Sequence, residues 1–296
     1  MIHALRSVAP RPSAATAGVP AYVLGGYRAG LAVVRSLGRA GVRVISAVSS
    51  PSRELAHRSR FVDTSVCLPD PADEPRAYFD RLLVLADQGS GVLIPTTDES
   101  LEVVAAHHVE LRGRYLLACP PQATARLFLD KENTSAVALA AGVDAPRTAS
   151  PRTGQELDEL IEQLQYPCLV KPRESFRYTR AFGVKMHRVE DGHQLREAWH
   201  RAHNLGIKTV VQELIPGPDT GGVNYNVYMA GGQPLVDFTS RKLRACSPPT
   251  LALRPRSSVL PYLKSSTPVG RSFLRWASRA SPTSSSNAMN GTIATS

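Results

Sequence analysis

The sequence of 296 residues is poor in several residue types that mark particular protein classes. Its four cysteines, Cys67, Cys119, Cys168 and Cys246, lie too far apart to match disulfide or metal-binding spacings, as in a reducing compartment. Aromatic residues make up 6% of the chain and do not alternate with basic residues, as single-stranded nucleic-acid binding requires. No apolar run approaches the roughly 18 residues that span a membrane. We therefore expect a cytoplasmic protein without nucleic-acid or membrane partners.

Carboxylate side chains are absent from the end of the sequence. Residues 245–296 contain no Asp or Glu, although they carry six of the 35 basic residues. Positions 1–244 then hold 29 basic and 25 acidic residues, so the formal charge of +10 falls to +4 there. Much of the basicity therefore belongs to this tail and does not indicate a nucleic-acid surface. The tail is rich in Ser, Arg and Pro without periodicity, so we predict that residues 245–296 are disordered.

Apolar segments alternate over residues 20–120 in a way that predicts a parallel sheet with intervening helices. Ala21–Leu24 ends at Gly25-Gly26, apolar residues then recur at helical spacing, and Val42–Val48 predicts a second strand. Such alternation is typical of a Rossmann-like domain, and residues 1–19 precede it as a predicted disordered extension. Further strands are predicted at 62–67, 91–94 and 114–117, with helices at 75–87, 98–106 and 122–128.

The first turn of this domain does not match a dinucleotide-binding turn. Gly25-Gly26-Tyr27-Arg28-Ala29-Gly30 lacks the G-x-G-x-x-G spacing. The second strand ends at Ser49-Ser50, where a ribose-binding acid is expected. We favour a structural turn, and a dinucleotide-binding oxidoreductase remains the alternative.

Two later apolar strands carry polar residues that suit a nucleotide. Tyr166–Pro172 presents Lys171 between prolines, and Val210–Gly217 presents Gln212 and Glu213 before a Pro-Gly turn. An ammonium group binds phosphate, whereas a carboxylate and free backbone groups bind adenine. The pair of strands therefore indicates a nucleotide site.

These strands and their neighbours resemble the ATP-grasp superfamily, whose members join a carboxylate to an amine through an acylphosphate. Asp130–Thr134 opens a helix and Gly142–Pro146 follows it, as in the family's D-K-x-x-x and G-[IV]-x-x-P segments. Pro95–Ser100 resembles the family's P-x-x-[DE]-E segment, in which Thr97 or Asp98 can also cap a helix. The resemblance implies an α/β fold. Its implied parts are a Rossmann-like domain at 20–120, an incomplete ATP-grasp domain at 121–244 and the tail at 245–296.

The resemblance also implies roles for single residues. Lys131 and Lys171 are implied phosphate contacts, and Asp219 is the implied ribose contact. Arg241 and Lys242 are the implied catalytic residues that face the phosphates. The implied adenine contacts come from the hinge residues Gln212, Glu213, Leu214 and Ile215.

In the family, the segment corresponding to Arg173–Phe182 is a hairpin loop that closes over the triphosphate, often through glycine backbone. Here it carries Arg173, Arg177 and Arg180, and Gly183 is its only glycine. Guanidinium groups can replace backbone amides as phosphate donors. A basic surface loop is the alternative.

The family's Mg²⁺ is held by carboxylates on two later strands, which residues 245–296 cannot supply, so we assign no metal ligands. Read one base back, Met289-Asn290 encodes a glutamate, and with suitable codons Ser281–Thr292 becomes A-D-V-E-F-K-R-D-E-R-D-D. In that frame Ser247–Ser257 can give A-P-D-F-G-T-A-S-S. Both strings resemble the family's C-terminal strands. We hypothesise a frameshift near residues 244–248, and sequencing the locus decides it.

The sequence thus predicts an ATP-binding protein of the ATP-grasp type, with ligation of a small carboxylate to an amine as the family activity and Mg²⁺ as the family's metal. The absence of metal-binding strands predicts that this chain is impaired. Two alternatives stay open: a catalytically inactive nucleotide-binding fragment and the oxidoreductase. The identity of the substrates and the oligomeric state are not readable from the sequence.

Overall fold

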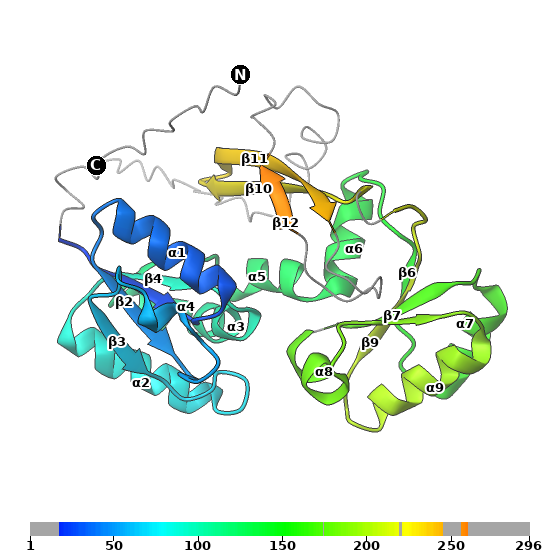
Figure 1. Ribbon diagram of the computed structural model, residues 1–296. Coiled ribbons are helices and arrows are strands. Elements are labelled where there is room, and N and C mark those ends of the chain that lie inside the picture. The colour runs from blue at the N-terminus through cyan, green and yellow to red at the C-terminus, as the bar shows by residue number, and fades with distance from the viewer. Residues whose placement is uncertain (1–17, 174, 219–220, 245–255, 260–296) are drawn as a thin grey trace, which may run out of the picture.

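A computed structural model describes residues 18–173, 175–218, 221–244 and 256–259 (Figure 1). These residues form a five-stranded parallel sheet, a four-stranded antiparallel sheet and a three-stranded antiparallel sheet. Within those ranges, no helix has the length and apolar character needed to cross a membrane. The predicted extension at 1–19 lies outside the described residues except for its last two positions.

The parallel sheet has the strand order β3-β2-β1-β4-β5, with helices between successive strands. This order and the crossovers confirm the predicted Rossmann-like fold. Its elements are β1 (Ala21–Leu24), α1 (Arg28–Arg39), β2 (Val44–Val48), a short 3₁₀ turn (Ala56–Arg58), β3 (Thr64–Cys67), α2 (Pro75–Gln88), β4 (Val92–Pro95), α3 (Asp98–Ala106), α4 (His108–Arg112) and β5 (Leu116–Leu117).

Side chains alternate between the two faces of this sheet, and each face has its own apolar cluster. Tyr22 and Leu24 of β1 pack with α2 and α3, whereas Val23 packs with Val34 of α1. The strands are therefore buried on both sides, which explains why they read as continuous apolar runs. At the end of β4, Thr97 caps α3 through a reciprocal pair of contacts with Ser100, so the capping prediction is confirmed for Thr97.

The four-stranded sheet has the order β6-β9-β7-β8 and is covered on one face by two helices. Val170 of β7 and Val211 of β9 pack against Leu157 of α7 and Trp199 of α9. The opposite face of β7 and β9 is left to polar side chains. The elements from the first domain onward are α5 (Gln122–Leu129), α6 (Lys131–Ala140), β6 (Thr148–Ala149), α7 (Gly154–Gln163), β7 (Cys168–Pro172), α8 (Ser175–Phe182), β8 (His187–Val189), α9 (Gly192–His203) and β9 (Thr209–Glu213).

The three-stranded sheet consists of β10 (Val223–Ala230), β11 (Gln233–Arg244) and β12 (Arg256–Val259). Gly231 and Gly232 both have positive φ, of 56° and 75°, as a tight hairpin turn between β10 and β11 requires. Met229 of β10 packs against α6, so this helix lies beside the hairpin (Figure 1).

Strand β12 corrects one prediction about the tail. Residues 256–259 were predicted to be disordered, but they pair antiparallel with Ser240–Arg244 of β11. The physical reason is the free edge of the hairpin, because an unpaired row of backbone N–H and C=O groups favours pairing with another extended segment. Residues 245–255 and 260–296 lie outside the described residues, so the rest of that prediction is not addressed.

Helix α8 corrects a second prediction. The segment after Arg173 was expected as a loop over the triphosphate, but residues 175–182 form a helix. Tyr178 and Phe182 lie one turn apart and pack with Ala202 and Ile207, and Tyr178 is fully buried. The Tyr178 hydroxyl also forms a hydrogen bond of 2.5 Å with His187 Nδ1. Burial of this aromatic pair therefore stabilises a helix where the family has a loop.

Candidate functional site

Lys171 and Gln212 come together on the face of the four-stranded sheet that α7 and α9 do not cover. Lys171 lies opposite Val210 and Gln212 opposite Leu169, so the strand pleat places both polar side chains on one face. The Lys171 ammonium group donates a hydrogen bond to Gln212 Oε1. Gln212 Nε2 in turn donates to Thr148 Oγ1 of β6 at 2.9 Å. Three neighbouring strands thus fix the position of one lysine.

The environment of Lys171 disfavours its charge. Burial lowers the pKa of the Lys171 ammonium group below its ordinary value, and the nearby cation of Lys131 lowers the pKa further. The printed partner of Lys171, the Gln212 amide, carries no charge that could compensate. A partly buried cation beside a second cation is an arrangement that an anionic ligand stabilises.

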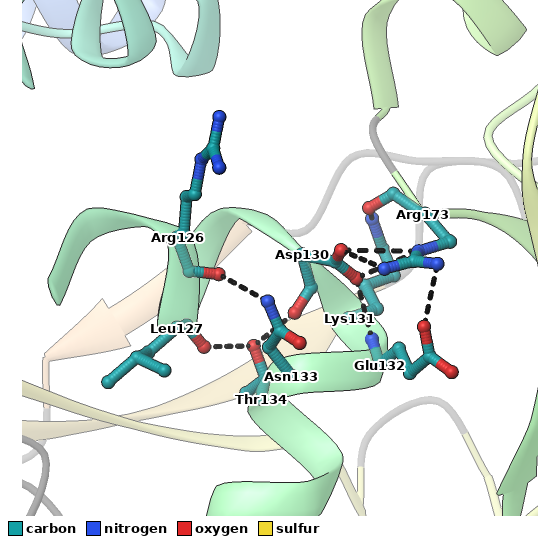
Figure 2. A network of polar contacts seen from close by, with 8 residues as sticks. All are labelled: Arg126, Leu127, Asp130, Lys131, Glu132, Asn133, Thr134 and Arg173. Carbon is teal, nitrogen blue, oxygen red and sulfur yellow. Dashed lines mark hydrogen bonds and ion pairs between the residues drawn. The ribbon is translucent and has the colours of Figure 1, made fainter. Parts of the chain in front are cut away.

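A network of charges organises the loop after β7 (Figure 2). Arg173 Nε lies 3.1 and 3.2 Å from the two carboxylate oxygens of Asp130, and a further Arg173 nitrogen contacts the same carboxylate. Arg173 also forms an ion pair of 2.7 Å with Glu132. Asp130 caps α6 by accepting the backbone N–H of Glu132 at 3.0 Å. Arg173 is thereby held by two carboxylates at the start of α6.

The pKa of Asp130 shows which influence is stronger in this network. Burial acts to raise the pKa of the Asp130 carboxyl group, but hydrogen bonds from Arg173 and from the Glu132 backbone lower it by more. The pKa therefore lies below its ordinary value, and Asp130 is ionised at neutral pH. Sequence reasoning found this segment but missed the pairing with Arg173, which joins residues 43 positions apart.

Lys131 is the first residue of α6 and points back to the strand-end loop. Its ammonium group donates to the backbone oxygen of Arg173 at 3.3 Å. Because Arg173 follows Lys171 by two residues, the structure brings Lys131 and Lys171 to the same end of β7. These two predicted phosphate contacts and Gln212 therefore form one cluster.

Glu213 lies outside that cluster. The pleat turns its side chain to the opposite face from Gln212, and its carboxylate pairs with Arg147 Nε at 2.9 Å. This hydrogen bond lowers the pKa of the Glu213 carboxyl group below its ordinary value. The backbone N–H of Glu213 donates to the Arg147 carbonyl oxygen at 2.9 Å. The Glu213 carboxylate must therefore leave Arg147 or share it in order to contact adenine, and this role stays a prediction.

The remaining predicted residues are only partly described. Ile215 is 60% exposed just after β9, as an apolar contact for a planar ring requires. Leu214 is partly buried beside it, whereas Asp219 lies outside the described residues. Arg241 is exposed in β11 and pairs in register with Val223. Lys242 is described only through its backbone, which pairs with Ser257 of β12.

The predicted phosphate donors of the arginine-rich segment are engaged elsewhere. Arg173 is held by Asp130 and Glu132. Arg180 forms an ion pair of 2.8 Å with Asp73 of the first domain. Arg177 donates to the Leu205 carbonyl oxygen at 3.4 Å. In this conformation these guanidinium groups do not gather over Lys171.

The first domain offers little room for a dinucleotide. Glu54 is 3% exposed, and its carboxylate accepts the backbone N–H groups of Gly26, of Ser49 at 2.9 Å and of Ser50 at 2.7 Å. These backbone donors lie at the carboxyl ends of β1 and β2, where dinucleotides bind in Rossmann folds. The cavity beside them, lined by Tyr27 among others, holds about 40 Å³, whereas ligand pockets usually hold several hundred. The geometry therefore disfavours the oxidoreductase alternative.

A metal site is not apparent within the described ranges, where no group of three or more His, Cys, Asp or Glu side chains is placed to hold an ion. The carboxylates nearest the lysine cluster, Asp130 and Glu132, are engaged by Arg173. The residues present therefore do not fit a Mg²⁺ site.

No protein-family model and no curated protein matches the sequence. Solved structures do match. The L-amino acid ligase from Bacillus licheniformis is 18% identical, with a TM-score of 0.62 over 88% of this chain and 59% of that chain. N5-carboxyaminoimidazole synthetase from Staphylococcus aureus, complexed with ADP, is 15% identical, with a TM-score of 0.58 over 77% of this chain and 56% of that chain.

A third similar structure is the biotin carboxylase domain of the Hydrogenobacter thermophilus 2-oxoglutarate carboxylase, in complex with MgADP, ADP and bicarbonate. It is 14% identical, with a TM-score of 0.62 over 88% of this chain and 57% of that chain. The chain thus spans less than two thirds of each of these proteins. The likenesses confirm the fold predicted from the motifs: this chain has an incomplete ATP-grasp fold that follows a Rossmann-like domain.

Proposed function

We propose that this chain binds ATP, with Lys131 and Lys171 at the phosphates and the hinge after Gln212 at the adenine. The observation that carries the proposal is the cluster of Lys171, Lys131 and Gln212, in which two neighbouring cations share one partly buried sheet face. A polyphosphate supplies the compensating charge that this cluster needs. The ADP and MgADP bound by the similar structures support the same ligand class.

The adenine end of the proposed site rests on the segment after β9. Gln212 is fixed by Lys171 and Thr148, and its position directs the following backbone toward the hinge. Leu214 and the exposed Ile215 offer apolar surface to a planar base. We assign the adenine to Gln212, Glu213, Leu214 and Ile215, and the ribose to Asp219.

We further propose that the activity of the complete protein is ATP-dependent ligation of a carboxylate to an amine. In such a reaction the substrate carboxylate takes the γ-phosphoryl group, ADP leaves, and the amine then displaces phosphate from the acylphosphate. Arg241 and Lys242 of β11 are proposed to face the phosphates, with the ATP-grasp part at 121–244 and the Rossmann-like part at 20–120. Because residues 245–296 lack carboxylates, this chain alone is proposed to be a weak catalyst or an inactive nucleotide-binding protein.

Replacement of Lys171 by alanine tests the nucleotide assignment. A charge-assisted hydrogen bond to phosphate contributes about 1.5–3 kcal/mol, so Lys171→Ala should weaken ATP binding by roughly 10- to 150-fold. Glu213→Ala should weaken it as well if the carboxylate reaches the adenine. Isothermal titration calorimetry with ATP measures both losses.

The matched control is His193→Ala, because His193 is exposed on α9 and lies outside the proposed site. This variant should bind ATP as the parent chain does. Unchanged ATP affinity in both Lys171→Ala and Glu213→Ala would mean that the site has been placed wrongly.

The lowered pKa of Lys171 predicts a pH dependence of ATP binding. Phosphate needs the ammonium form, which this lysine loses at a lower pH than an ordinary lysine does. ATP affinity should therefore fall as the pH rises through the lowered pKa, and bound phosphate should raise that pKa again. In Lys171→Arg the side chain stays charged, so its affinity, relative to its own value at pH 7, should change less. Parallel pH profiles of the two proteins would contradict this role of Lys171.

A further inference from the structure

A cavity of about 760 Å³ lies between the first domain and the helices that follow it. Its walls come from α2 and α3 on one side, and from α5, α6 and the region of Arg173 and Lys208 on the other. An ion pair between Arg180 and Asp73 spans the same two parts of the chain at 2.8 Å. The cavity is large enough for a small organic ligand.

One wall of the cavity is acidic. Helix α3 presents Asp98, Glu99 and Glu102 to the cavity from its first two turns. Asp98 forms no ion pair with any described residue. Burial raises the pKa of the Glu99 carboxyl group above its ordinary value, as expected for a carboxylate without a cation beside it. This wall therefore suits a cationic group.

The facing wall is basic. It carries Arg126 of α5, Arg177 of α8 and Lys208. Figure 2 shows that the Arg126 side chain points away from the network around Arg173. Neither Arg126 nor Lys208 forms an ion pair within the part of the chain that the structure describes. Arg173 and Asp130 also line the cavity, but they bind each other. This wall therefore suits an anionic group.

Apolar residues complete the cavity between the charged walls. They are Pro71, Ala72, Pro75, Val103, Ala106 and Leu129. A ligand that matches all three features has an ammonium group, a carboxylate and an apolar body.

We propose that this cavity binds a free α-amino acid with an apolar side chain, as a zwitterion. Its ammonium group faces Asp98 and its carboxylate faces Arg126 and Lys208. The proposal rests on the proposed ligation and names its substrate class, because an amino acid carries both of the groups that a carboxylate–amine ligase joins.

The test uses the whole chain without nucleotide and measures binding of L-leucine and L-phenylalanine by calorimetry. L-leucinamide lacks the carboxylate and N-acetyl-L-leucine lacks the ammonium group, so each should bind about tenfold more weakly or worse than L-leucine. Asp98→Asn should weaken L-leucine by a similar factor but leave N-acetyl-L-leucine unchanged. Arg126→Gln and Lys208→Gln, singly and together, should weaken L-leucine but leave L-leucinamide unchanged. Arg112→Gln, an exposed arginine outside the cavity, is the matched control and should change nothing.

Two results overturn the proposal: absence of binding of both amino acids, or equal binding of L-leucine and its two derivatives in all variants. ATP titration of the same preparation separates this outcome from failure of the nucleotide site. Loss of amino-acid binding with ATP binding intact refutes the cavity assignment alone, and the reverse refutes the nucleotide assignment alone.

Discussion

The 296-residue chain, supplied with ATP, Mg²⁺, amino acids and small carboxylates, should release phosphate at least about a thousandfold more slowly than a version with restored carboxylates. The restored version reads residues 245 onward in the alternative frame. A bridging cation stabilises the charge on the transferring phosphoryl group by several kcal/mol, and residues 245–296 offer no carboxylate to hold it. Coupled phosphate-release and ligation assays on both proteins measure the difference.

The restored version should also be more soluble. Leu235, Val236 and Phe238 of β11 are 61%, 62% and 42% exposed, and apolar strands with free edges promote aggregation. Robust Mg²⁺-dependent ATP hydrolysis that is coupled to ligation in the 296-residue chain itself would show that the metal ligands have been misplaced.

Glu54→Ala should lower the free energy of unfolding of the first domain by about 3–5 kcal/mol. The variant leaves the buried N–H groups of Gly26, Ser49 and Ser50 without their acceptor. Each unpaired buried donor costs about 1–3 kcal/mol, although water that enters the small cavity recovers part of this loss. Chemical denaturation followed by circular dichroism measures the change.

Glu54→Gln separates the acceptor from the side-chain volume. Its amide oxygen can replace one carboxylate oxygen, but its NH₂ group then faces a backbone donor, so an intermediate loss of about 1–3 kcal/mol is expected. Glu197→Ala, an exposed position on α9, should change stability by less than about 0.5 kcal/mol. Equal stability of Glu54→Ala and the parent would contradict the structural role of this carboxylate.

The Rossmann-like domain was predictable because its strands are buried on both faces and its helices carry regular apolar spacing. The Glu54 contacts were not predictable, since they join the ends of β1 and β2 through an acid in an irregular segment. Only the folded backbone shows that three donors converge there. The same fact explains why the Gly25-Gly26 turn departs from the dinucleotide pattern without harm to the fold.

In the second half, the motif order predicted the nucleotide cluster, but not how its members are held. Lys171 and Gln212 were both predicted, whereas the Gln212 contact with Thr148 and the Arg173 contacts with Asp130 and Glu132 depend on strand register. The helix α8 was missed because a family likeness was given more weight than local pattern. The spacing of Tyr178 and Phe182 already favoured a helix.

Hydrogen exchange with and without ATP tests the central claim most directly, because it locates the ligand on the chain. The account predicts that ATP slows exchange in segments 168–172 and 209–215, around Lys171 and the hinge, and that Lys171→Ala reduces this protection. Segments 21–26 and 44–50, beside Glu54, should be unaffected by ATP or by NAD. Protection by NAD at these first-domain segments, or none by ATP around Lys171, would contradict the account.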